Sequence, residues 1–205
     1  MTDAANITAL AELKPDYMGL IFYPKSKRFV GELNIRLLET IRESIKLTGV
    51  FVNENLDLVI NKIKQYHLKA VQLHGDETPQ YCRLLRDQSS QANCKIEIIK
   101  AFGIDANFDF NDLEAYVDVV DFFLFDTKTP AYGGSGIKFN WDILKNYQCK
   151  KQYFLSGGID TEDMSELRLL NDVRIYAVDL NSKFEISPGL KDIEKLRGAV
   201  DILRS

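Results

Sequence analysis

Apolar runs typical of buried strands alternate with helical patterns along almost the whole chain. The run Tyr17–Tyr23 is nearly continuous in apolar residues, as in strands buried on both faces of a parallel sheet. A helical pattern follows over about residues 34–46. The other predicted strands are Thr48–Val52, Ala70–Leu73, Ile96–Ala101, Asp121–Phe125, Tyr153–Leu155 and Arg174–Leu180. The other predicted helices are Leu56–Tyr66, Pro79–Arg86, Asn111–Tyr116, Trp141–Tyr147, Glu162–Leu170 and Leu190–Leu203. This alternation predicts βα units around a parallel sheet.

The chain opens on a predicted helix rather than on a strand. Thr2 or Asp3 can cap a helix whose apolar pattern runs to Leu13, and Pro15 ends it. About seven strands and eight helices then fit a (β/α)₈ barrel, a TIM barrel, that lacks its first strand. A doubly wound open sheet is the alternative that the pattern leaves. No linker or low-complexity segment interrupts the alternation, so the sequence predicts one α/β domain over residues 1–205.

Composition disfavours several classes of function. A net charge of -4 argues against a binder of nucleic acids or anionic membranes, because phosphate contacts need a basic surface. No apolar run approaches the ~20 residues of a membrane span, and no export signal is visible. The three cysteines are widely spaced without a CxxC pair, and with two histidines they indicate neither a disulfide framework nor a metal site. These features predict a cytoplasmic protein with reduced thiols.

Three residues that follow predicted strands are candidates for chemistry, because barrels place their active sites where strands end. Arg28 offers a planar fork that suits a carboxylate or a phosphate; its alternative is a solvated loop cation. His74 follows a short strand directly, where a histidine with a purely structural role is the alternative. Asp126 comes after an apolar strand, where a partly desolvated carboxyl group suits a general acid. Capping of the following loop is its alternative.

Late strand ends carry small and polar residues that together predict an anion site. Glycines let backbone N–H groups approach a phosphate closely, and barrels commonly bind phosphate after their last two strands. Turns use the same residues, which is the alternative interpretation. The candidate phosphate ligands are Gly133, Gly134, Gly157, Gly158, Asp179, Asn181 and Ser182.

Several longer strings occur in order along the chain. They are GLIFYPKSKR at 19–28, GVFVN at 49–53, VQLHGDE at 71–77, FDT at 125–127, GGSG at 133–136, FNW at 139–141, SGG at 156–158 and PGLKD at 188–192. Through these strings the sequence resembles the phosphoribosylanthranilate isomerase family over essentially its whole length. FYPKSKR and QLHGDE are the most specific of them.

This resemblance implies a (β/α)₈ barrel of tryptophan biosynthesis that works without a cofactor or a metal. The implied reaction is an Amadori rearrangement of N-(5-phosphoribosyl)anthranilate to 1-(2-carboxyphenylamino)-1-deoxyribulose 5-phosphate, an aldose–ketose isomerisation. By resemblance, Asp126 is the general acid that opens the ribose ring, and Arg28 holds the anthranilate carboxylate. His74 belongs to the substrate-binding set, and the glycine loops with Asn181 and Ser182 hold the phosphate. The implied partner is this small phosphosugar, and the protein is expected to be a monomer or a homodimer.

The sequence departs from the family at two points. The family's general base is a cysteine in a Cys-Gly motif at the end of the first strand, and no cysteine of this sequence matches it. Lys183 stands where the family usually has glycine after the phosphate-binding serine, so phosphate binding there can differ. A catalytically inactive phosphosugar-binding barrel is therefore the alternative function. A different phosphosugar enzyme on the same scaffold is disfavoured by FYPKSKR.

Met1-Thr2-Asp3 fits the residues that follow Cys-Gly in the family. We therefore expect about eight in-frame codons upstream of Met1 that encode an apolar, β-branched strand ending in Cys-Gly. Reading the upstream DNA tests this expectation. A stop codon directly before Met1, with no alternative start, would contradict it.

Overall fold

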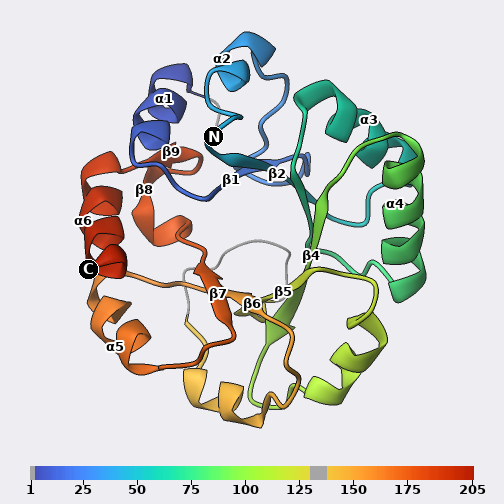
Figure 1. The fold of residues 1–205 in the computed structure, drawn as a ribbon. Helices are drawn as coiled ribbons and strands as arrows, with labels where there is room; N and C mark the ends of the chain where they lie inside the picture. Colours follow the sequence, from blue (N-terminus) through green and yellow to red (C-terminus); the bar gives the residue numbers. More distant parts are fainter. Residues whose placement is uncertain (1–2, 130–137) are drawn as a thin grey trace.

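The computed structural model describes residues 3–129 and 138–205. Seven parallel strands form one sheet in the order β1 to β7, so each strand lies beside the next one in the chain. The sheet curls around a central space and the helices lie outside it (Figure 1). The strands are β1 (Tyr17–Ile21), β2 (Lys46–Phe51), β3 (Ala70–Leu73), β4 (Glu97–Ile104), β5 (Phe122–Thr127), β6 (Tyr153–Leu155) and β7 (Ile175–Val178). This confirms the predicted α/β barrel type and excludes the doubly wound alternative, whose strand order reverses within the sheet.

Helices connect the strands and begin at the capping residues that the sequence offers. The α-helices are α1 (Ala4–Glu12), α2 (Ile35–Glu39), α3 (Leu56–Tyr66), α4 (Pro79–Gln91), α5 (Met164–Leu169) and α6 (Ile193–Arg204). The 3₁₀ helices are η1 (Phe110–Tyr116), η2 (Trp141–Asn146), η3 (Thr161–Asp163) and η4 (Ser182–Phe184). Asp3 caps α1 by accepting a hydrogen bond of 2.7 Å from the backbone nitrogen of Asn6. No described helix has the length and apolar character that crossing a membrane requires.

Two predicted helices differ from the observed ones. The helix expected over 34–46 is the short α2, because the chain turns over 40–44 and β2 already begins at Lys46. The helix expected from Leu190 begins instead at Ile193, because β8 (Glu185–Ser187) and β9 (Leu190–Lys191) form an antiparallel hairpin before it. Gly189 in the hairpin turn has a φ of 87°, which favours glycine. The Pro188-Gly189 pair in the sequence therefore indicates the turn between β8 and β9.

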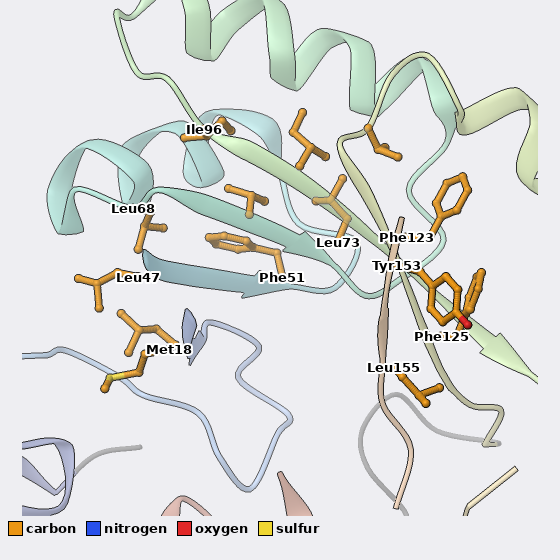
Figure 2. Packing of buried hydrophobic residues seen from close by; sticks show 14 of the residues in the cluster. Met18, Leu47, Phe51, Leu68, Leu73, Ile96, Phe123, Phe125, Tyr153 and Leu155 are labelled. Carbon is orange, nitrogen blue, oxygen red and sulfur yellow. The ribbon is translucent and has the colours of Figure 1, made fainter. Parts of the chain in front are cut away.

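The main core lies between the outer face of the curled sheet and the helices. Successive strand residues face opposite sides of a sheet, so every second residue of each strand enters this layer. The layer contains Met18, Leu47, Phe51, Leu73, Phe123, Phe125, Tyr153 and Leu155, which Figure 2 shows together. The rings of Phe125 and Tyr153 pack with centroids 4.7 Å apart. Burial of these aromatic side chains contributes much of the apolar driving force that holds neighbouring βα units together.

The intervening strand residues line the central space. A second, smaller buried cluster consists of Ala70, Ile99, Ala101, Leu124 and Phe154. Toward the carboxyl ends of the strands the same inward face continues with polar side chains. Asp126 lies two residues after Leu124, and both line the central cavity. Strand alternation therefore aims the carboxylate of Asp126 into the barrel.

The sheet is not closed within the described residues. Strand β1 pairs with β2, and β7 pairs with β6, but no pairing joins β1 to β7. The central cavity reaches both of these edge strands, and Gly19 of β1 is exposed there.

A buried ion pair fixes the loop after β3. Lys100 Nζ lies 3.3 Å from Glu77 Oε2, and their side chains are 3% and 1% exposed. Burial lowers the pKa of Lys100, whereas Glu77 acts in the opposite direction. Lys100 also donates to the carbonyl of Gly75 at 2.7 Å, and Glu77 accepts from the backbone nitrogens of Asn53 and Gly75 at 2.8 and 3.0 Å. The pair therefore holds the segment that begins with His74.

Replacing Lys100 tests this role. In Lys100→Met the carboxylate of Glu77 stays buried without its cation, so we expect a loss of about 3 kcal/mol in the free energy of unfolding, measured with urea. Adding Glu77→Gln should restore much of the loss, because no buried charge then remains. Lys128→Met, which removes a cation from an exposed ion pair, is the matched control. A stability of Lys100→Met within about 0.5 kcal/mol of wild type would contradict the role.

Candidate functional site

A cavity of about 550 Å³ occupies the centre of the curled sheet, and its lining extends from the carboxyl ends of the strands to residues of α1 and α6. Near the carboxyl ends of the strands, its polar lining comes from β3 and β5, from the loops after β1, β3, β6 and β7, and from the β8–β9 hairpin. This part of the lining includes Arg28, Gln72, His74, Asp126, Ser156, Asp179, Asn181, Ser182, Glu185 and Lys191. Gly157 and Gly158 also line it. The structure thus brings together every predicted site residue that it describes, whereas Gly133 and Gly134 lie outside the described residues.

Asp126 and His74 form the central pair of the site. Asp126 is 9% exposed at the end of β5, and its Oδ2 lies 3.2 Å from His74 Nε2. Its Oδ1 accepts a hydrogen bond of 2.8 Å from the backbone nitrogen of Thr127. Gln72 Nε2 lies 2.7 Å from His74 Nδ1; when this amide donates, Nδ1 accepts and the ring proton is on Nε2, facing Asp126. A carboxyl group that shares a proton with an imidazole can act as a general acid.

Backbone geometry explains the glycines after β6. Gly157 has a φ of 95°, which disfavours any residue with a side chain. A Cβ atom at Gly157 would lie 2.8 Å from the backbone nitrogen of Thr127 and 3.2 Å from Asp126 Oδ1. This strand end therefore needs glycine to approach β5 closely. Consecutive backbone N–H groups in a bend of this kind can bind an anion.

Asp179 is a second carboxyl group inside the cavity. Ser156 Oγ donates to Asp179 Oδ2 at 3.0 Å. Desolvation raises the pKa of Asp179, Lys191 acts against this, and the negative charge of Asp126 adds to it. The carboxyl group of Asp179 therefore keeps its proton to a higher pH than the carboxyl group of an exposed aspartate does.

Asn181 and Ser182 follow β7 at the start of η4. Lys191 Nζ contacts Asn181 through the side-chain oxygen at 2.8 Å and the carbonyl at 3.2 Å. The side chain of Lys183 is exposed, and its carbonyl accepts a hydrogen bond of 2.7 Å from Lys195 Nζ. The departure at position 183 therefore adds a side chain on the solvent side of the loop.

Arg28 reaches the cavity from the loop after β1. Its Nε and Nη2 both lie 2.8 Å from Glu185 Oε2. Burial acts to raise the pKa of Glu185, but Arg28 and Lys191 outweigh it and hold this pKa below its usual value. The guanidinium has five N–H donors, so this contact leaves donors for a substrate carboxylate.

Sequence reasoning missed Gln72, Glu185 and Lys191 as site residues. Gln72 is the polar residue within the otherwise apolar strand β3, which was a readable signal. Glu185 and Lys191 flank a Pro-Gly turn, but Lys191 was predicted to be helical. The cysteines do not line the cavity: Cys82 is buried in α4, where burial raises its pKa to about 11. The described residues contain no cluster of side chains suited to a metal ion.

Comparison with known proteins decides the family. Residues 1–202 match the family model for N-(5'-phosphoribosyl)anthranilate (PRA) isomerase. This chain belongs to the PRA isomerase family. A PRA isomerase of Parabacteroides distasonis is 40% identical over 202 residues, which cover 98% of this chain and 89% of that protein. The family assignment that the sequence strings suggested is thereby confirmed.

Solved structures of PRA isomerases have the same fold. The Thermotoga maritima enzyme is 31% identical with a TM-score of 0.81, and the match covers 100% of this chain and 95% of that one. A PRA isomerase structure in complex with reduced 1-(o-carboxyphenylamino)-1-deoxyribulose 5-phosphate is 27% identical, with a TM-score of 0.78 and the same coverage. The T. maritima enzyme is described as dimeric in a further structure.

Proposed function

We propose that this chain binds N-(5-phosphoribosyl)anthranilate and, with a general base supplied near β1, isomerises it to 1-(2-carboxyphenylamino)-1-deoxyribulose 5-phosphate. The single observation that carries the proposal is the partly buried Asp126–His74 pair in a cavity with cationic and glycine-rich ends. The reaction moves a hydrogen from C2 to C1 of the sugar and leaves its overall oxidation state unchanged. It therefore needs an acid and a base but no redox cofactor.

Asp126 is suited to the first step. Its protonated carboxyl group would give a proton to the ribose ring oxygen, so that the C1–O bond breaks and the aniline nitrogen forms a Schiff base with C1. His74 Nε2 at 3.2 Å hydrogen-bonds to the carboxylate that remains. Burial of Asp126 beneath the substrate would keep the proton from exchanging with bulk water. Removal of the C2 proton then gives an enolamine, which tautomerises to the ketone.

The two anionic ends of the substrate match the two polar ends of the cavity. Arg28 would bind the anthranilate carboxylate through charge-assisted hydrogen bonds. The phosphate would lie against backbone N–H groups of Gly157 and Gly158 and the Asn181–Ser182 loop. Gly133 and Gly134 belong to the same proposed set. Asp179 would approach a sugar hydroxyl, because it lines the cavity and its carboxyl group is oriented by Ser156.

The base for C2 is the part that the described residues do not supply. The family resemblance implies a cysteine on a strand beside β1, and the cavity is open along β1. A phosphosugar-binding barrel without catalysis is the result expected when such a strand is missing. The protein is proposed to act in the cytoplasm, because its phosphorylated substrate and product do not cross membranes readily. It is proposed to be a monomer or a homodimer.

Replacing Asp126 tests the proposed general acid. In a version extended by a strand ending in Cys-Gly, Asp126→Asn keeps the side-chain shape but cannot deliver a proton. We expect kcat to fall by about 10²–10⁴, with KM nearly unchanged, in a fluorescence assay of substrate consumption. Asp142→Asn on the exposed surface of η2 is the control and should turn over like wild type. Near-full turnover of Asp126→Asn would remove Asp126 from the mechanism.

The 205-residue chain itself should bind but barely turn over. The proposed phosphate ligands that the structure describes lie on the loops after β6 and β7, whereas the base would lie beside β1. A missing positioned base typically costs about 10²–10⁴ in rate. Calorimetry with inorganic phosphate or product measures binding, and loss of substrate anthranilate fluorescence measures turnover. Turnover equal to that of the extended version would place the base elsewhere, and a folded chain that binds no phosphate would contradict the anion site.

A further inference from the structure

The β8–β9 hairpin lies between the two proposed anion-binding ends of the cavity. At one end, Glu185 Oε2 contacts both Nε and Nη2 of Arg28 at 2.8 Å. The carboxylate side chain of Glu185 is 3% exposed and that of Arg28 is 15% exposed. This ion pair is thus largely shielded from water, so its geometry is held more strongly than that of a surface pair.

At the other end, Lys191 contacts the loop after β7. Its Nζ donates to Asn181 Oδ1 at 2.8 Å, to the Asn181 carbonyl at 3.2 Å and to the Leu180 carbonyl at 3.3 Å. The same Nζ lies 3.5 Å from Glu185 Oε1. A continuous chain of polar contacts therefore runs from Arg28 through Glu185 and Lys191 to Asn181.

The hairpin itself is anchored to elements on both sides. The side-chain amide of Asn6 in α1 both donates to the carbonyl of Lys191 and accepts from its backbone nitrogen, each at 2.8 Å. The backbone nitrogen of Asp192 donates to the carbonyl of Phe184, which is fully buried. Figure 1 shows β8 and β9 between α1 and α6. These contacts fix the hairpin, so side chains attached to it have defined positions.

We propose that Glu185 and Lys191 are positioning residues that set the separation and orientation of the two anion sites. Glu185 holds the guanidinium of Arg28 toward the substrate carboxylate, and Lys191 holds Asn181 at the phosphate loop. A flexible arginine loses side-chain entropy when it binds a carboxylate, and an arginine that is already ordered loses less. The inference rests on the proposed function, because it assigns Arg28 and Asn181 to opposite ends of one substrate.

The test measures the affinity of the 205-residue chain for two probes by calorimetry. The first probe is reduced 1-(o-carboxyphenylamino)-1-deoxyribulose 5-phosphate, which carries both anionic ends, and the second is inorganic phosphate. Glu185→Gln keeps the shape and an acceptor oxygen but removes the charge, so we expect about tenfold weaker binding of the two-ended probe. Its phosphate affinity should stay within about twofold of wild type. Lys191→Met should weaken both probes, by about fivefold or more, because Asn181 loses its contact.

Controls separate this inference from general loosening of the fold. Glu194→Gln removes an exposed carboxylate from α6 and should leave both affinities and the melting temperature unchanged. Equal weakening of both probes in Glu185→Gln would indicate loosening and overturn the positioning role. Tighter or unchanged binding of the two-ended probe would show that Glu185 competes with the substrate for Arg28, or is indifferent to it, and would also overturn the role.

Arg28→Ala distinguishes failure of the inference from failure of the proposed function. When Arg28→Ala loses affinity for the two-ended probe but Glu185→Gln does not, the positioning role is wrong and the carboxylate site stands. A wild-type chain that is folded but does not bind the two-ended probe contradicts the proposed function, and the inference falls with it.

Discussion

Alternation of side chains along parallel strands, imposed on a sheet that curls, is the constraint on which both the core and the site depend. Because successive residues face opposite sides, each strand supplies the sheet–helix layer with one set of side chains and the central cavity with the other. In β5, Phe123 and Phe125 pack outward, whereas Leu124 and Asp126 face inward. A shift of one residue in register would bury Asp126 among aromatic rings and turn Phe125 into the cavity.

The curl of the sheet then concentrates the polar ends of separate strands. His74 follows β3 and Asp126 ends β5, yet the two side chains lie 3.2 Å apart. Contacts outside the cavity also fix the position of His74. Lys100 and Glu77, in the layer beneath the helices, fix the start of the loop that carries His74. Stability of this outer layer and geometry of the site are thus connected through the same short segment.

Burial gives the charged groups of the cavity their distinct properties. Burial raises the pKa of Asp179 and lowers that of Lys191, because each charged form loses water contacts. The pKa of Glu185 is lowered, because two neighbouring cations outweigh the effect of its burial. The cavity therefore holds one carboxyl group, Asp179, whose pKa is raised and another, Glu185, whose pKa is lowered.

The sequence by itself determined the order of strands and helices, the position of Asp126 near the end of β5 and the glycines after β6. These features rest on local rules, namely apolar runs, capping residues and the backbone freedom of glycine, which act between residues close in the chain. Tertiary structure alone decided which distant side chains meet. Arg28 pairs with Glu185 and Asn6 clamps Lys191 because the curled sheet brings the chain's first and last βα units together. Lys191 was predicted to be helical from the apolar pattern of the residues that follow it in the chain. Its position in a hairpin depends instead on contacts with α1 and with the loop after β7.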